Sequence, residues 1–302
     1  MLPYATIVEA EAALGRNLTF LEVVWFRYSS RMPDYLLYYH SILCIFVVFT
    51  LAPLPLALIE LGLPASISPF KIQPKVRHPP TLFFHCYKEA MWTLILSVGS
   101  FQLTCYPVFK FVGIRTGLPL PSFWEAALQL LVYFLVEDYL NYWLHRLLHT
   151  KWVYEKIHYI HHEYAAPIGW HALYAHWGDL LFPGIVAFAG PALVPCHVVI
   201  LWLFGSLLVL ASIECHTGYD FPWSPTKFVP FYGGAIYHDY HHSVGYHSQS
   251  NFGSFFTYCD YVYGTDKGYR YRKALLAKLK APSSDYNEEG QTHGFKNDRK
   301  FD

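Results

Sequence analysis

Histidine is the residue type around which the chemistry of this sequence gathers. Of 17 histidines, eight form three tight groups: His145 and His149; His158, His161 and His162; and His238, His241 and His242. Residues three and four positions apart in a helix lie on one face, so each group would present its imidazoles on a single helical surface. Burying so many imidazoles without partners would be costly, and imidazole is a common ligand of zinc, copper, iron and nickel. The pattern therefore predicts a metal site.

The number of donors indicates two metal ions. A tetrahedral ion takes about four protein ligands and an octahedral ion at most about six, so eight or more donors exceed the capacity of one ion. His216, in the stretch ECHTGYDF, is the best candidate for a ninth ligand. His176, in YAHWGD, is a weaker candidate that could instead hold a ligand in place. The other candidates for hydrogen bonds that support the ligands are Asp138, Asn141, Glu163 and Asp239.

The type of metal chemistry is narrowed by what the motifs contain. A hydrolytic zinc helix would show H-E-x-x-H with a carboxylate as general base, and this pattern does not occur in the sequence. All-nitrogen ligation beside membrane segments favours iron and dioxygen, although ligand type alone does not exclude zinc. The six cysteines show no C-x-x-C spacing, and we expect them to be structural.

The elements that must position the histidines have the composition of membrane helices. The chain is 54% hydrophobic and only 15% charged, which is too apolar for an ordinary soluble domain, and its balanced charge gives no reason to expect a nucleic-acid partner. A spanning helix needs about 20 mostly apolar residues. Four regions approach that length: 38–63, 90–112, 123–144 and 180–213. Pro53 and Pro55 predict a break in the first region, and the GPALVP stretch at 190–195 predicts a turn in the fourth.

We therefore expect an all-α integral membrane protein with about four membrane-embedded helical segments and a cytosolic, histidine-rich helical di-metal domain. The expected parts are an N-terminal region at 1–37, transmembrane helices at 38–144, a catalytic domain at 145–280 that includes a membrane hairpin at 180–213, and a disordered polar tail at 281–302. A hairpin returns the chain to the face it left, so histidines on both sides of it can share one site. Basic residues between the first two spans place that face in the cytosol by the positive-inside rule.

Several motifs resemble those of a known group of enzymes. HRLLH, HYIHHEY and HDYHH resemble the three histidine boxes of the membrane-bound fatty acid hydroxylase and sterol desaturase superfamily, whose members are non-haem di-iron enzymes of the endoplasmic reticulum. FKIQPKV, GYDFPWSP and YGTDKGYR are similar to stretches of the plant sterol 4α-methyl oxidases, in the subgroup that acts on 4,4-dimethylsterols. The resemblance places iron ligands at the eight grouped histidines, with His216 as an additional ligand. Gly178-Asp179 departs from the family pattern, in which we expect a small residue and Glu.

The resemblance also implies a reaction and partners. The reaction is stepwise oxidation of a sterol 4α-methyl group through alcohol and aldehyde to carboxylate, with two iron ions, dioxygen and electrons from NAD(P)H. A C4-decarboxylating sterol dehydrogenase would then act on the product. No dinucleotide, flavin or haem motif occurs in the sequence, so the electrons must come from an external donor, in this family one like cytochrome b5 with its reductase.

A basic surface is the predicted docking site for that acidic donor. Its residues are Lys151, Lys156, Lys227, Lys267, Arg270, Arg272 and Lys273. Contact between the same residues and anionic lipid is an equally favoured interpretation.

Three other functions remain open. The first is oxidation of 4α-monomethylsterols, and the second is lipid hydroxylation or aldehyde deformylation on the same di-iron scaffold. The third is a non-enzymatic zinc-binding membrane protein or transporter. GYDFPWSP counts against the second. The position of the boxes just past the apolar regions counts against the third, for which histidines within the spans are expected.

Overall fold

Helices form the architecture of the computed structural model, which describes residues 3–244 and 249–280. Within these residues the only β-type pairings are three isolated bridges, which confirms the all-α prediction. Side-chain caps fix where helices begin. Ser122 accepts a hydrogen bond from the backbone of Glu125 at the start of the longest helix, α9 (Phe123–Leu148). Thr19 and Glu22 form a capping box at the start of α2 (Phe20–Ser29).

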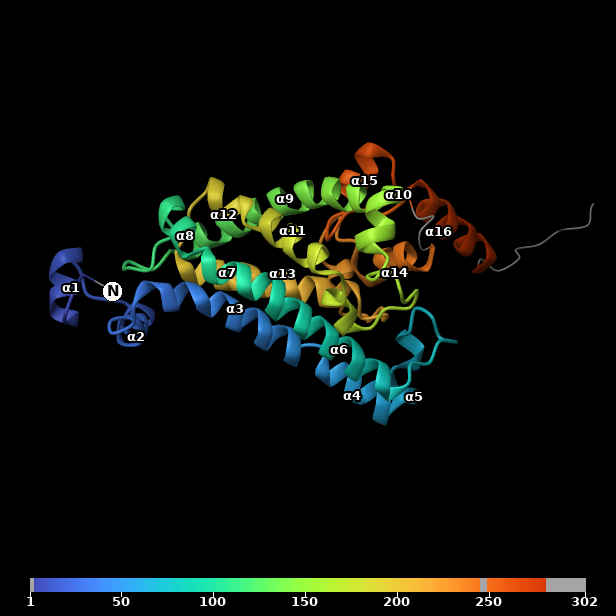
Figure 1. The fold of residues 1–302 in the computed structure, drawn as a ribbon, viewed down its shortest axis with the longest axis horizontal. Coiled ribbons are helices and arrows are strands. Elements are labelled where there is room, and N and C mark those ends of the chain that lie inside the picture. The colour runs from blue at the N-terminus through green and yellow to red at the C-terminus, as the bar shows by residue number, and fades with distance from the viewer. Residues whose placement is uncertain (1–2, 245–248, 281–302) are drawn as a thin grey trace, which may run out of the picture.

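Five helices lie side by side (Figure 1), and buried apolar residues form clusters between them. The five helices are α3 (Asp34–Leu51), α6 (Pro80–Leu94), α9, α11 (Trp177–Ala187) and α13 (Val198–Cys215). α13 packs along α3, while α11 and α12 (Ala189–Leu193) pack against α9. Gly190 permits the contact between α12 and α9, because a Cβ atom there would lie 2.9 Å from the Cα of Tyr133.

Other helices connect or flank these five. They are α1 (Ile7–Leu14), α4 (Leu54–Gly62), α5 (Pro64–Ile67), α7 (Ser100–Thr104), α8 (Tyr106–Val112), α10 (Lys151–Val153), α14 (Gly234–Val244), α15 (Tyr258–Tyr263) and α16 (Lys267–Lys280). Single 3-10 turns lie at 68–70, 169–173 and 225–227, and π-helical turns at 95–99 and 154–158. α10, which leads into the π-helical turn with His158, and the histidine-bearing α14 lie at one end of the molecule, and α1 and α2 lie at the other (Figure 1).

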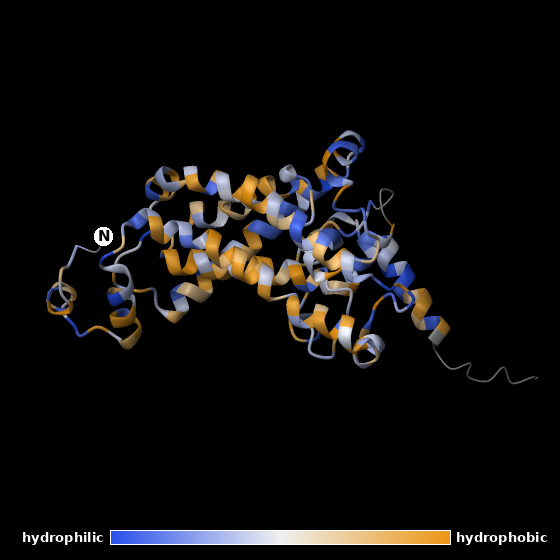
Figure 2. Cartoon of the chain, turned by 60° about the horizontal axis from the view of Figure 1, so that its bottom comes forward, coloured by the Kyte–Doolittle hydropathy of each residue, from blue (hydrophilic) through white to orange (hydrophobic). Residues whose placement is uncertain are grey.

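Two helical segments of the described chain are long and apolar enough to cross a membrane. They are Asp34–Gly62 and α13, and the bent pair Pro80–Thr104 and Tyr106–Val112 would be a third. Only 17% of the apolar window in Asp34–Gly62 is buried within the protein, so most of its surface is available to lipid. Figure 2 shows the same predominance of apolar residues along the long helices. These segments agree with three of the four regions expected to enter the membrane.

The remaining region, 123–144, forms a helix but not one that meets the same requirement. α9 turns Gln129, Glu137 and Asp138 into the protein interior. These polar residues lower its hydropathy below that of the spanning segments, although the opposite face of α9 exposes large apolar side chains such as Leu128, Leu131 and Leu135. The region 180–213 comprises most of α11, α12 and most of α13, and the chain leaves helical structure between α12 and α13. α3 ends and α4 begins around Pro53, as the prolines predict. The predicted disordered tail at 281–302 lies outside the described residues.

Candidate metal centre

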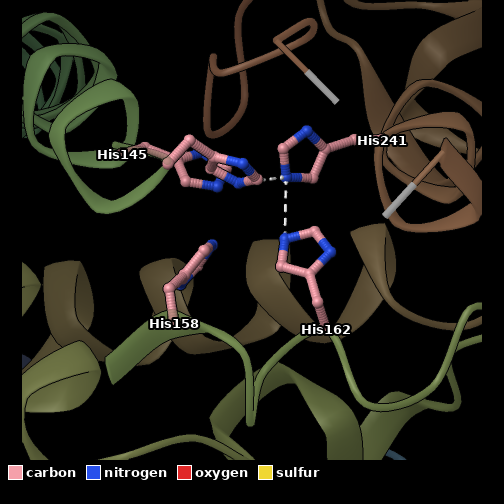
Figure 3. A group of neighbouring side chains, drawn as sticks. His145, His158, His162 and His241 are labelled. Atoms are coloured by element: carbon pink, nitrogen blue, oxygen red, sulfur yellow. Dashed lines mark hydrogen bonds between the residues drawn. The ribbon is translucent and has the colours of Figure 1, made fainter. Parts of the chain in front are cut away.

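Nine histidines converge at the end of the bundle that carries α14. The first group is His145, His149, His158, His162 and His241. The second group is His161, His216, His238 and His242. Within each group the ligand nitrogens all lie within 4.8 Å of one another, and every histidine except the partly buried His161 is buried. Figure 3 shows how the rings of the first group point toward one common space.

The elements that carry the histidines end or turn where the groups meet. α9 supplies His145, and His149 is its C-terminal capping residue. The π-helical turn 154–158 and the residues just after it supply His158, His161 and His162. His216 follows the last turn of α13, and α14 supplies the remaining three histidines. Segments on both sides of the hairpin therefore meet at one site, as the parity of the hairpin predicts.

The spacing between ring nitrogens fits metal coordination. In the first group, Nε2 of His241 lies 3.2 Å from Nε2 of His149 and 3.1 Å from Nε2 of His162. In the second group, Nε2 of His216 lies 3.3 Å from that of His161 and 2.9 Å from that of His238. An ion about 2.0–2.1 Å from each nitrogen would separate neighbouring ligands by about 3.0 Å in octahedral and about 3.4 Å in tetrahedral geometry. Both groups have the dimensions of an ion's ligand shell.

Hydrogen bonds at Nδ1 leave the Nε2 lone pairs available to a cation. Nδ1 of His145 donates to the carbonyl of Phe252 over 2.9 Å, and Nδ1 of His241 donates to the carbonyl of Ser250 over 2.7 Å. Nδ1 of His216 donates to the carbonyl of Ser212 over 2.7 Å. A carbonyl oxygen can only accept, so these rings carry their proton on Nδ1 and point an unprotonated Nε2 inward.

Burial keeps the clustered imidazoles neutral. Loss of hydration lowers the pKa of His158 well below its usual value, and nearby His145 adds to the effect. Loss of hydration likewise lowers the pKa of His242, with contributions from His162 and His238. Nε2 of His158 is buried and has no hydrogen-bond partner among the described residues. A bound cation would satisfy this nitrogen, and neutral imidazole is the form that binds metal.

The expected supporting residues lie around the centre in different ways. Asp138 accepts from the backbone of Phe255 and Phe256, 3.0 Å each, and so anchors the loop that carries Phe252. Glu163 accepts from the hydroxyl of Tyr174, whose carbonyl accepts from Nδ1 of His161 over 3.3 Å. Neither carboxylate contacts a histidine directly. Asp138 acts through the loop that carries Phe252, and Glu163 acts through Tyr174.

Three further candidates lie away from the histidine rings or contact other groups. Asp239 accepts from the amide of Gln73, 3.0 and 3.1 Å from its two oxygens, which ties the FKIQPKV stretch to α14. His176 accepts from the backbone of Gly178 at the start of α11 and belongs to neither group. The amide of Asn141 donates to the hydroxyl of Ser254.

Asp179 is the carboxylate that sequence reasoning missed. Its Oδ1 accepts from Nδ1 of His158 over 3.2 Å, and both side chains are buried. In the sequence Asp179 appeared only as a departure from the family pattern, 21 residues beyond its partner. One signal in the sequence was available. Asp179 is an acidic residue in the first turn of the first hairpin arm, at the end of that arm nearest the histidines.

An apolar cavity of about 480 Å³ borders the histidines. Its walls come mainly from α3, α6 and the π-helical turn after it, α7, α8, α9, α11 and α13, and they include Leu94, Val98, Phe109, Leu201 and Phe204. Five of the clustered histidines border it: His145, His158, His161, His216 and His238. A cavity of this volume suits one lipid-like molecule with a reacting group beside the metal centre.

The seven basic residues expected to dock a partner are exposed. Lys151 and Lys156 lie on α10 and the π-helical turn after it, and four others lie on α16. Lys227 pairs with Asp220 over 2.9 Å. Both groups of basic residues lie at the histidine-rich end of the molecule (Figure 1).

The apolar helices and the buried histidine groups define a membrane protein with a histidine-rich metal centre. Comparison with known proteins gives the family: the chain belongs to the fatty acid hydroxylase family, whose sequence model matches residues 130–265. This confirms the family expected from the three motifs and identifies the chain as an oxidoreductase.

The relatives are similar over nearly the whole chain. Methylsterol monooxygenase 1-1 of Arabidopsis thaliana is 56% identical over 99% of this chain and 100% of its own length. Very-long-chain aldehyde decarbonylase GL1-10 of Oryza sativa subsp. japonica is 61% identical over 98% of both chains. Methylsterol monooxygenase 2-2 of Arabidopsis thaliana is 43% identical over 76% of this chain and 85% of its own. No solved structure matches the chain significantly.

Replacing Asp179 by Ala should weaken metal binding by roughly 10–100-fold, because His158 loses the hydrogen bond that orients its ring. Asp179→Asn keeps an acceptor oxygen and should lose less. The measurement is competitive titration of metal-free protein against a chromophoric chelator. Asp220→Asn changes a more accessible carboxylate, paired with Lys227, and should bind metal as the unaltered protein does. Equal affinity in Asp179→Ala and the unaltered protein would contradict the role of Asp179.

Proposed function

We propose that this chain is a sterol C4-methyl monooxygenase that oxidises the 4α-methyl group of 4,4-dimethylsterols with two iron ions. The observation that carries the proposal is the apolar cavity that ends at five of the clustered histidines. It offers a rigid, water-insoluble substrate a site in which one end meets the metal ligands. Support also comes from the Arabidopsis relatives named methylsterol monooxygenases, three of which are 56–57% identical to this chain.

The ligand assignment within this proposal follows the two groups. His145, His149, His158, His162 and His241 would hold one ion, and His161, His216, His238 and His242 the other. Bound iron would supply the redox chemistry that activates dioxygen. The protein's own part is to fix the ligand rings through Nδ1 hydrogen bonds, to exclude water and to hold the methyl carbon at the end of the cavity.

The reaction balance explains why outside electrons are needed. Each step consumes dioxygen, two electrons and two protons, inserts one oxygen atom into a C–H bond of the substrate and releases one water. The second insertion gives the hydrated aldehyde, which loses a further water to become the aldehyde. Three such steps take a methyl group through alcohol and aldehyde to a carboxylate. The product suits a separate C4-decarboxylating sterol dehydrogenase. The proposed electron route is NAD(P)H, a reductase and a cytochrome b5-like protein, at the cytosolic face of the endoplasmic reticulum membrane.

A second candidate function comes from the rice relative at 61% identity, which is named a very-long-chain aldehyde decarbonylase. The same cavity and histidines could serve an aldehyde, so the two functions must be separated by substrate. Oxidation of 4α-monomethylsterols is the third candidate, and it differs from the first by one methyl group.

Sterol profiling tests these candidates directly. The chain is expressed in a yeast strain that lacks its own C4-methyl oxidase and is supplied separately with a 4,4-dimethylsterol, a 4α-monomethylsterol and a very-long-chain aldehyde. We expect oxidation at C4 of the 4,4-dimethylsterol. His161→Ala should abolish it while membrane insertion persists, because His161 belongs to the second histidine group. His85→Ala, at an exposed histidine of α6, is the matched control and should retain activity.

Activity on the monomethylsterol alone would show that the preferred substrate is a 4α-monomethylsterol and not a 4,4-dimethylsterol. Conversion of the aldehyde to a shortened hydrocarbon, with both sterols unchanged, would overturn the proposal in favour of the second candidate. Full sterol oxidation by His161→Ala would contradict the ligand assignment.

Charge reversal on α16 tests the docking of the electron donor. Lys267→Glu with Arg270→Glu should slow reduction of the iron-loaded protein by cytochrome b5 about tenfold at low salt, because steering between opposite charges is lost. The difference should shrink as salt is raised. Arg31→Glu, in the exposed turn between α2 and α3 at the other end of the molecule, should have no effect. Stopped-flow reduction provides the rates, and an unchanged rate in the α16 variant at low salt would exclude this docking surface.

A further inference from the structure

A polar patch interrupts the apolar wall of the cavity beside the metal centre. It consists of Glu137, Asn141 and Ser254, all of which line the cavity. Glu137 and Asn141 precede the metal-site histidine His145 by two turns and one turn of α9, so the three side chains share one helical face. Ser254 lies two residues beyond Phe252, whose carbonyl accepts from His145. The patch therefore adjoins the first histidine group.

The patch has hydrogen-bonding capacity that the protein does not use. The amide of Asn141 donates to Ser254, which leaves the serine hydroxyl hydrogen and the Asn141 carbonyl oxygen without a partner among the described residues. Glu137 is only 4% exposed, and its Oε2 has no hydrogen-bond partner among those residues. A polar atom buried without a partner, as Glu137 Oε2 is, is costly, so its presence at a cavity wall beside the unused groups of Asn141 and Ser254 points to a ligand that supplies the missing hydrogen bonds.

A second polar spot in the cavity, made of Ser41 on α3 and Gln102 on α7, contains no buried carboxyl oxygen without a partner among the described residues. The hydroxyl of Ser41 already donates to the carbonyl of Tyr38 over 2.6 Å and approaches Gln102 Oε1 at 3.4 Å. Within the described chain, the buried oxygens without a partner in the cavity wall, Glu137 Oε2 and Asp179 Oδ2, belong to the end near the histidines, which favours that end for the polar group of a ligand.

Sterol chemistry identifies the polar group that this patch would meet. A 4,4-dimethylsterol has one hydroxyl, on C3, directly bonded to the C4 that carries the reacting methyl groups. The rest of the molecule is hydrocarbon. When a C4 methyl group faces the histidines, the hydroxyl must lie within a few ångströms of it. Asn141 is one helical turn, about 5.4 Å, from His145, which matches this arrangement.

We propose that Asn141 and Ser254, with Glu137, bind the C3 hydroxyl of the substrate and thereby position the C4 methyl group at the metal centre. The inference rests on the proposed sterol function. The substrate hydroxyl donates to Asn141 Oδ1 or Glu137 and accepts from the Ser254 hydroxyl. Asn141, Ser254 and Glu137 are thus substrate-positioning residues. They select molecules that carry a hydroxyl on the carbon bonded to C4, the atom that bears the reacting methyl group.

The test measures binding to the purified full chain in nanodiscs, metal-free and iron-loaded. The probes are a radiolabelled 4,4-dimethylsterol and its C3 methyl ether, which is larger and cannot donate. The unaltered protein should bind the free sterol about tenfold or more tightly than the ether. Asn141→Leu and Ser254→Ala should reduce this preference to less than about threefold by weakening binding of the free sterol. Gln102→Leu, which removes an amide from the other end of the cavity, should keep the full preference.

The outcomes separate the inference from the function on which it rests. If the unaltered protein does not bind the free sterol and does not oxidise it, the proposed function itself is overturned. An unaltered protein that prefers the free sterol, with Asn141→Leu and Ser254→Ala both keeping that preference, would overturn the inference alone. Metal content and thermal unfolding report whether each variant folds. If Asn141→Leu does not fold, Ser254→Ala and Glu137→Gln decide the result.

Discussion

The structure depends on one constraint: nine neutral imidazoles are gathered in an interior that hydrates few of them. Their Nε2 atoms approach to about 3 Å in both groups, a spacing that neutral rings tolerate best when a cation lies between them. Backbone carbonyls of Phe252, Ser212 and Ser250 fix three of the rings by accepting from Nδ1. The helices bring the histidines together, and these carbonyls set their direction.

α9 links this centre to the rest of the molecule. One face carries His145, Asn141 and Glu137, which run from the first histidine group along the cavity wall. The neighbouring Asp138 turns away and accepts two backbone hydrogen bonds from the loop that contains Phe252 and Ser254. The same helix therefore positions a proposed metal ligand, the loop that orients it and the polar patch proposed to bind substrate. Its interior acidic residues, which make it too polar for a typical span, are part of this role.

Sequence patterns predicted the helical class, three of the membrane segments, the hairpin and the convergence of nine histidines, because each follows from composition or local spacing. They did not predict how the nine histidines are distributed between the two groups. Each H-x-x-H-H motif was expected to present its histidines on one surface, yet His241 and His242 belong to different groups, since successive helical residues point about 100° apart. Asp179 was missed because tertiary packing, and not sequence proximity, brings it to His158.

The central claim is that the two groups hold two metal ions, and metal stoichiometry tests it most directly. Metal-free protein is reconstituted anaerobically with ferrous iron, and iron per chain is counted by elemental analysis after removal of loosely bound ions. The account predicts two ions in the unaltered protein and about one each in His241→Ala and His238→Ala, which alter different groups. A single ion in the unaltered protein, lost in both variants, would contradict it.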